Sequence, residues 1–227
     1  MQIVIPSAGR GSRMNELTDA LPKPLLEVNG KTLLEHKFDA LPEGVDEIVI
    51  VVGYMGGMIQ QKFGGSYKDK RILYVEQEVL DGTAGALWRA KDILTDRFLV
   101  MNGDDLYVRE DVAHCMAINE WAMLVKELDH VQSGNVRIED NGTILEIKEG
   151  PHDGSKGLTN TGLYALDTRI FDYPMIPKAP GNDEYGLPQT ITAAAKESGI
   201  PFIAVKATDW IQITSPGDIQ KAEALLK

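Results

Sequence analysis

Two kinds of hydrophobic pattern divide the chain. Up to about residue 120, short runs rich in valine and isoleucine alternate with segments whose apolar residues recur at helical spacing. Strands buried on both faces are predicted at 2–6, 46–54, 71–77 and 97–105, and helices between them at 31–41, 58–63 and 83–94. Strands that alternate with helices indicate an α/β fold with a doubly wound, mainly parallel sheet.

The pattern changes after about residue 120. Strand-like segments there are joined by turns, and "DNGT" (140–143) is typical of a hairpin, so we expect antiparallel structure. A helix at 187–199, a strand at 201–207 and a helix at 215–227 follow, the last with Ser215 as N-cap and Pro216 as its first helical residue. We interpret 1–227 as a single domain, with 1–110 and 111–227 as its two halves.

Composition narrows the class of protein. The chain has 227 residues, 43% of them hydrophobic, and a formal net charge of -11, which disfavours a nucleic-acid surface. Its one cysteine, Cys115, allows no intrachain disulfide, which favours a reducing compartment. There is no leader-like N-terminus and no apolar run of membrane-spanning length, so we expect a cytoplasmic protein that acts on small molecules.

The loop "SAGRGSRM" (7–14) follows the first predicted strand. It lacks the third glycine of the dinucleotide fingerprint G-x-G-x-x-G, because Met14 stands there, and no Walker A motif occurs in the chain. Its two glycines let backbone N–H groups approach phosphate oxygens beside Arg10 and Arg13, with Lys23 nearby. The loop alone is compatible with a triphosphate site or with a tight turn bearing solvated arginines.

Further motifs decide between these readings. They are "AGRGSRM" (8–14), "PKPLL" (22–26), "VVGY" (51–54), "EQEVLDGTAGAL" (76–87), "NGDDL" (102–106), "NTGLY" (160–164) and "NDEYGLPQTI" (182–191). With them the chain resembles the sugar-1-phosphate nucleotidyltransferases, or nucleoside-diphosphate-sugar pyrophosphorylases, over essentially its whole length. The resemblance implies a Rossmann-like, GT-A-like fold with a small antiparallel sugar-binding subregion. Because the sequence stops at Lys227, we expect no C-terminal β-helix of the kind that longer members carry.

The resemblance also implies a reaction and its residues. A nucleoside triphosphate and a sugar 1-phosphate would give a nucleotide sugar and pyrophosphate; because the attacking phosphate is already ionised, no general base is required. Arg13 and Lys23 would be catalytic, Arg13 facing the departing phosphates and Lys23 bridging the sugar phosphate and the α-phosphate. The other implied residues bind nucleotide (Ala8, Gly9, Gly11, Gln77, Gly82 and Thr83), sugar (Gly103, Glu149, Asn160 and Gly162) or Mg²⁺ (Asp104 and Gln212).

Several positions depart from the family pattern or invite another role. Gln212 stands in "WIQITSP" where members commonly have aspartate, and its amide brings no charge to a Mg²⁺ ion. Gly150 in "EGP" replaces a lysine expected near the sugar phosphate. We interpret Asp105 as part of the "NGDD" turn. Cys115 beside His114 is interpreted as a buried cysteine rather than a nucleophile.

UTP or dTTP with a hexose 1-phosphate is the favoured substrate pair. One alternative is a CTP-dependent cytidylyltransferase for a non-sugar phosphate such as phosphocholine. Another is a non-catalytic regulatory protein that senses a nucleotide sugar; Arg13, Lys23 and Asp104 speak against it, since mere binding needs no transition-state cations. Neither nucleic acid nor membrane is expected as a partner, and the nucleobase, the sugar and a homo-oligomeric state stay open.

Overall fold

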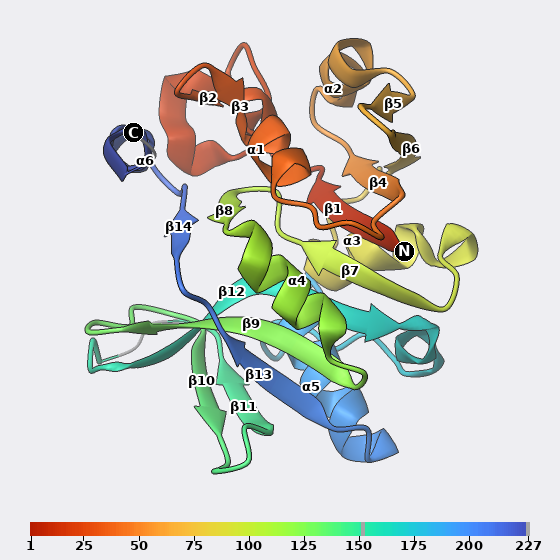
Figure 1. Cartoon of the computed structure of the whole chain (residues 1–227), viewed down its shortest axis with the longest axis vertical. Helices are drawn as coiled ribbons and strands as arrows, with labels where there is room; N and C mark the ends of the chain where they lie inside the picture. The colour runs from red at the N-terminus through yellow and green to blue at the C-terminus, as the bar shows by residue number, and fades with distance from the viewer. Residues whose placement is uncertain (151–152, 226–227) are drawn as a thin grey trace.

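The computed structural model describes residues 1–150 and 153–225. The strands of its main sheet are β1 (Gln2–Ser7), β4 (Glu47–Val52), β5 (Ser66–Tyr67), β6 (Lys70–Glu76), β7 (Arg97–Met101), β9 (Trp121–Leu128), β10 (Asn135–Ile138), β11 (Ile144–Lys148), β12 (Gly157–Asp167) and β13 (Phe202–Lys206). They run in the order β11-β10-β12-β7-β1-β4-β6-β5, and β9 joins β12 to β13 (Figure 1). Two small sheets pair β2 (Glu27–Val28) with β3 (Lys31–Thr32), and β8 (Asp105–Tyr107) with β14 (Trp210–Gln212).

Helices cover both faces of the main sheet. They are α1 (Leu33–Asp39), α2 (Gly56–Phe63), α3 (Gly82–Arg89), α4 (Arg109–Ala117), α5 (Leu187–Ser198) and α6 (Pro216–Leu225), with 3₁₀ turns η1 (Ser12–Thr18), η2 (Lys23–Leu25), η3 (Lys91–Ile93) and η4 (Thr168–Asp172). Among the helices of the described residues, none is both long and apolar enough to span a bilayer.

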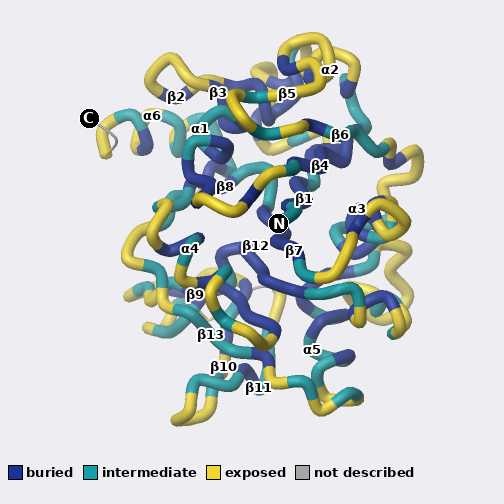
Figure 2. Tube along the Cα trace, turned by 45° about the vertical axis from the view of Figure 1, so that its right-hand side comes forward, coloured by how far each residue is buried: buried dark blue, intermediate teal, exposed yellow. Residues whose placement is uncertain are grey.

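The N-terminal half confirms the predicted parallel arrangement. β1 pairs in parallel with β4 and β7, and β4 pairs in parallel with β6. Alternate residues of β1 enter different cores: Val4 packs with α3 and α5, whereas Ile3 and Ile5 pack with α1, α2 and α4. Both faces are therefore buried, as the dark trace through the centre of Figure 2 shows.

The C-terminal half contains the predicted antiparallel region. β12 joins it to the parallel half, because its residues 163–167 pair with β7 while residues 157–160 pair with β9 and β10. The register of β12 against β9 shifts between Asn160 and Tyr164. β13 adds to β9 in parallel, and the hairpin predicted at 140–143 joins β10 to β11.

Some predicted boundaries were wrong. The strand expected at 97–105 ends at Met101, because the chain turns where Gly103 lies directly against the main chain of Pro6. Asp105 is not part of that turn; it is the first residue of β8 and is only 2% exposed. The last helix begins at Pro216, as predicted, but residues 226–227 of the predicted span lie outside the described residues.

No crossover helix follows β1 directly. The chain first passes through η1 and η2, in agreement with the proline signal at Pro22 and Pro24. α1 then begins after a capping box, in which Thr32 and Glu35 satisfy each other's free backbone N–H groups. The loop after β1 is thus left free of a helix that would fill the sheet edge.

Candidate active site

Two adjoining cavities open at the carboxyl edge of the parallel strands, where ligands of open α/β sheets bind. The first, of about 440 Å³, is lined by the loop after β1, by the segments after β6 and β7, and by residues including Lys178, Glu184 and Gln212. The second, of about 370 Å³, is lined by β12, by the loop before β10, by the start of α5, and by Trp210. Thr83, Asn102, Lys178 and Gln212 line both cavities, which therefore form one continuous site.

The structure gathers nearly all of the residues named from the sequence around these cavities. The first cavity is lined by Ala8, Gly9, Gly11, Arg13, Lys23, Gln77, Gly82, Thr83, Gly103, Asp104 and Gln212. The second is lined by Glu149 and Asn160 as well as by Thr83 and Gln212. Gly162 lines neither. Its backbone has φ +78°, and a Cβ there would overlap the side chain of Asn102, so this glycine makes room for Asn102 between the cavities.

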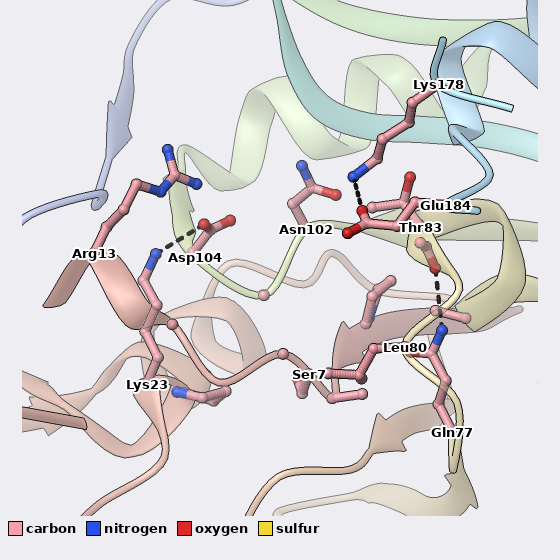
Figure 3. A pocket seen from close by; sticks show the side chains of 18 of the residues that line it. Ser7, Arg13, Lys23, Gln77, Leu80, Thr83, Asn102, Asp104, Lys178 and Glu184 are labelled. Atoms are coloured by element: carbon pink, nitrogen blue, oxygen red, sulfur yellow. Dashed lines mark hydrogen bonds and ion pairs between the residues drawn. The ribbon is translucent and has the colours of Figure 1, made fainter. Parts of the chain in front are cut away.

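Cations gather with Asp104 at one end of the first cavity. Lys23 Nζ donates to Asp104 Oδ2 at 2.8 Å, and the guanidinium of Arg13 lies beside this pair (Figure 3). Gly11 has φ +69°, and a Cβ there would come 2.9 Å from Lys23 Cβ, so a larger residue would press against this lysine. The loop after β1 and η2 thus bring two positive charges to one carboxylate.

The other end of the first cavity is formed around an amide. Gln77 Nε2 donates to Asp81 Oδ1 at 2.8 Å and to the Gly82 carbonyl at 3.1 Å, which fixes the plane of a nearly buried side chain. Gly82 has φ +95°, and its Cα lies against the main chain of Tyr185, where a Cβ would overlap. Ala84 N donates to the Tyr185 carbonyl at 3.1 Å. The loop 81–84 is therefore bonded to the segment that leads into α5.

Neutral polar groups dominate the second cavity. Asn160 Nδ2 donates to the Tyr164 hydroxyl at 2.7 Å and lies 3.4 Å from Glu149 Oε1. Asn160 Oδ1 accepts from Gly162 N at 2.8 Å, so the amide is oriented by two fixed partners. Such a side chain can donate to and accept from hydroxyl groups at a defined geometry.

Several residues that line the cavities were not singled out from the sequence, and three of them stand out by their contacts: Asn102, Lys178 and Glu184. Asn102 stands between the cavities and donates its backbone N–H to Gly162 at 2.9 Å. Lys178 and Glu184 form an ion pair across a short hairpin before α5, above Thr83 in Figure 3. Asn102 belongs to the "NGDD" motif and Glu184 to "NDEYGLPQTI", so both could have been found there, whereas Lys178 lies outside the quoted motifs.

A buried charged cluster lies beneath Asp104. Lys37, from α1, is fully buried and donates to the main-chain carbonyl of Asp105. Burial lowers the pKa of Lys37 to about 8, although Asp105 and Asp104 attract its proton. Burial and the neighbouring Asp104 raise the pKa of Asp105 well above its usual range. Tyr107 completes the cluster, and no sequence motif pointed to Lys37.

Asp104 and Gln212 are the residues that could hold a metal ion. The pairing of β8 with β14 brings them together, since Gln212 stands opposite Asp105 and Ile213 N donates to the Asp104 carbonyl at 3.1 Å. Within residues 1–150 and 153–225 no group of three or more His, Cys, Asp or Glu side chains could hold a metal. Two oxygen donors fit a Mg²⁺ ion that takes its other ligands from substrate phosphates and water.

Cys115 is confirmed as a buried cysteine. Its side chain is fully buried on α4, and burial raises the pKa of the thiol to about 12. The reactive form of cysteine is the thiolate, so this residue is no nucleophile at neutral pH.

Comparison with known proteins agrees with the geometry. The family described as "Nucleotidyl transferase" matches residues 2–224. The chain is 32% identical to "Bifunctional protein GlmU" of Methanocaldococcus jannaschii over 227 residues, 100% of this chain and 54% of that protein. It is 31% identical to "UTP--glucose-1-phosphate uridylyltransferase AglF" of Haloferax volcanii, over 100% of this chain and 97% of that protein. It thus spans about half the length of the first relative and nearly all of the second.

A solved structure shares the fold. The crystal structure of a UDP-glucose pyrophosphorylase complexed with UDP-glucose superposes with a TM-score of 0.83, at 20% identity, over 99% of this chain and 97% of that chain. The predicted α/β nucleotidyltransferase fold is therefore confirmed.

Proposed function

Since the chain belongs to the nucleotidyl transferase family, we propose that it transfers a nucleotidyl group from a nucleoside triphosphate, UTP or dTTP by preference, to a sugar 1-phosphate. The products are a nucleotide sugar and pyrophosphate. The observation that carries the proposal is the Lys23–Asp104 pair beside Arg13, at the end of one cavity that continues into a second, neutral one.

The charges of the first cavity suit a polyphosphate. Phosphoryl-type transfer depends on positioning and on neutralising charge at the oxygens, rather than on a protein nucleophile. Arg13 and Lys23 supply two cations, and the backbone of Ala8, Gly9 and Gly11 lines the wall next to them. The inert Cys115 agrees with a reaction that uses no thiol.

The proposed reaction proceeds in one displacement. A phosphate oxygen of the sugar 1-phosphate bonds to the α-phosphorus, and the bond from that phosphorus to the oxygen bridging to the β-phosphate breaks. Pyrophosphate leaves with the bonding electron pair while Arg13 faces its growing charge. Lys23 holds the attacking and the α-phosphates together, which offsets their mutual repulsion.

Mg²⁺ is the proposed cofactor. Asp104 and Gln212 would hold it, and when bound it would withdraw charge from the phosphate oxygens. Because Gln212 is neutral, the protein contributes one carboxylate where a two-carboxylate site would contribute two.

We infer that the two halves of the chain divide the substrates. Residues 1–110 supply most of the first cavity, in which Gln77, Gly82 and Thr83 would read the edge of the nucleobase. Residues 111–227 supply most of the second cavity, in which Glu149 and Asn160 would bind sugar hydroxyls. Gly103 would pack its backbone near the sugar. Gly162 is proposed to act indirectly, through the space it leaves for Asn102.

The test is pyrophosphate release from a grid of five nucleoside triphosphates and several phosphorylated acceptors, with Mg²⁺ present. Turnover of UTP or dTTP with a hexose 1-phosphate is the expected result. Turnover with CTP and phosphocholine alone would show that the acceptor is an alcohol phosphate and not a sugar 1-phosphate. Binding of a nucleotide sugar with no turnover in any combination would make the protein a sensor and would refute the proposal.

A further inference from the structure

Lys37 is the most deeply buried charged side chain near the site. It lies within the apolar stripe of α1, together with the buried residues Leu33, Leu34 and Phe38, and its own exposure is 0%. Taking an ammonium group out of water is costly unless other groups compensate for the lost hydration. A leucine at this position would continue the stripe, so the contacts of the charge itself require explanation.

The ammonium group of Lys37 reaches the strand that follows Asp104. It donates to the main-chain carbonyl of Asp105 and lies 5.7 Å from the centre of the Tyr107 ring. The Tyr107 hydroxyl donates to the Thr161 carbonyl of β12 at 2.7 Å and lies 3.4 Å from Asp105 Oδ2. The side chain of Lys37 therefore joins α1 to β8, and the side chain of Tyr107 joins β8 to β12.

These contacts hold the residue next to Asp104 from several sides. Asp104 lies in the turn between β7 and β8, outside any regular strand, and Asp105 begins β8. β14 fixes the other edge of β8, where Ile213 N donates to the Asp104 carbonyl at 3.1 Å. Lys37 is the tether from α1, because it donates to the main-chain carbonyl of Asp105, the residue that follows Asp104.

Lys37 also balances charge below the site. Asp105 is 2% exposed, and its Oδ1 is buried without a hydrogen-bond partner. Asp104 adds a second carboxylate one residue earlier, and the amine of Lys23 reaches Asp104 from the cavity side. Lys37 places a second cation beneath the turn, and both Asp105 and Asp104 attract it electrostatically.

We propose that Lys37 is a positioning residue for Asp104: it tethers the start of β8 and supplies the buried countercharge that keeps the Asp104 carboxylate directed into the first cavity. The inference rests on the proposed role of Asp104 in holding a divalent cation. Lys37 touches no substrate in this arrangement, so its effect must appear in how well the cation end of the site is formed.

The test measures cation binding apart from turnover. Binding of Mn²⁺ to the protein with UTP and no acceptor is followed by loss of the free Mn²⁺ signal in electron paramagnetic resonance. Lys37→Met is expected to weaken Mn²⁺ about tenfold, the range found when a group that orients a metal ligand is removed. Leu34→Ala is the matched control: Leu34 is fully buried one turn earlier on α1, in the core with Ile5 and Val52. It should lower the melting temperature but leave Mn²⁺ affinity within about twofold.

A second variant keeps the test decisive if Lys37→Met folds poorly. Lys37→Met/Asp105→Asn leaves no unpaired charge of this pair in the core, so it should fold better than the single variant. It still lacks the tether to β8 and should bind Mn²⁺ about tenfold more weakly than the wild type. Wild-type affinity in this double variant, or equal losses in Lys37→Met and Leu34→Ala, would overturn the inference. If the wild type itself released no pyrophosphate from any pair, the proposed function would fail instead.

Discussion

The two cavities are lined by different kinds of chemical group. The first is lined by loop backbone and charged side chains: Gly9 and Gly11 follow β1, and Arg13, Lys23 and Asp104 face one another. The second is lined mainly by neutral side chains of strands and of a helix start, such as Asn160 on β12 and Gln189 on α5. We infer from this contrast that substitutions near the charged reaction centre disturb close backbone contacts. In the second cavity, a single side chain can be replaced without moving the backbone.

The largest expected effect is at the charged end. Lys23→Met should lower kcat about 10²- to 10³-fold, because removing one preorganised group that stabilises transition-state charge reduces kcat by about this factor. The measurement is steady-state pyrophosphate release at saturating substrates. Lys196→Met, which removes an exposed lysine from α5, is the control and should be neutral. A loss below about threefold would show that the charged end is not where catalysis is concentrated.

Asp39 and its partners Lys31 and Lys68 form a charge network outside both cavities. We expect this network to affect folding stability and not substrate binding. Burial alone would raise the pKa of Asp39, but hydrogen bonds from Lys31 and Lys68 outweigh it and lower the pKa from 3.8 to about 2. A carboxyl group whose folded pKa is lowered contributes stability above pH 4 and loses it as the pH falls towards 2; because both lysines are exposed, solvent screening limits this contribution to about 1 kcal/mol. Urea denaturation of the wild type and Asp39→Asn should therefore converge as the pH falls from 5 to 2. A constant gap between them would contradict this.

Asn160 tests the neutral cavity. Asn160→Ala removes the amide that is oriented by Tyr164 and Gly162, and it should raise KM for the sugar 1-phosphate about tenfold, the value of one to two hydrogen bonds. KM for the nucleoside triphosphate should stay within about twofold. Equal rises in both constants would mean that the two cavities do not divide the substrates.

Gln212 lies where the cavities meet and tests the metal role. Gln212→Asp adds a carboxylate beside Asp104 and should lower the Mg²⁺ concentration for half-maximal turnover about fivefold. Gln212→Asn, which keeps the amide, is the control. An unchanged Mg²⁺ dependence in the aspartate variant would rule out coordination by this residue.

The smallest effect concerns an apolar side chain on the loop before Gly82. Leu80 is 50% exposed and lines the first cavity, whereas its neighbour Val79 is 64% exposed and is not among the lining residues. Leu80→Ala should raise KM for the nucleoside triphosphate about threefold through lost apolar contact with the nucleotide, and Val79→Ala should not. The two variants are compared by nucleotide titration. Identical behaviour would make Leu80 an ordinary surface residue.

Much of this arrangement could be predicted from the sequence, for physical reasons. Buried parallel strands such as β1 and β4 are continuous apolar runs, and the phosphate loop keeps its glycines and Arg13 within a few residues. Such local signals gave the alternation of parallel strands with helices, whereas most of the named cavity residues came from the family resemblance. Gln77 and Asp104 were named because the family resemblance implies their roles, and the structure places each of them after a strand at the same edge of the sheet.

Contacts between distant segments could not be predicted in this way. Lys37 looks like an ordinary helix lysine until β8 is placed over α1, since its partner Asp105 is 68 residues away. Asp105 itself was read as a turn residue because Asn-Gly-Asp favours turns, and tertiary pairing with β14 overrode that preference. The assignment of Gly162 to the sugar stays a prediction, and its second role, leaving space for the side chain of Asn102, depends on a contact between segments far apart in the sequence.

The contact between Gly82 and Tyr185 has a thermodynamic consequence. Asp81 and Ala84 are hydrogen-bonded to Tyr185, which directly precedes Gly186 and the first residues of α5, all of which line the second cavity. A ligand that orders the 81–84 loop would therefore also order part of the neighbouring cavity. The conformational entropy of this ordering would be lost when the first ligand binds, and not again when the second binds. Linkage requires such an effect to be mutual: each substrate would change the affinity of the other by the same factor.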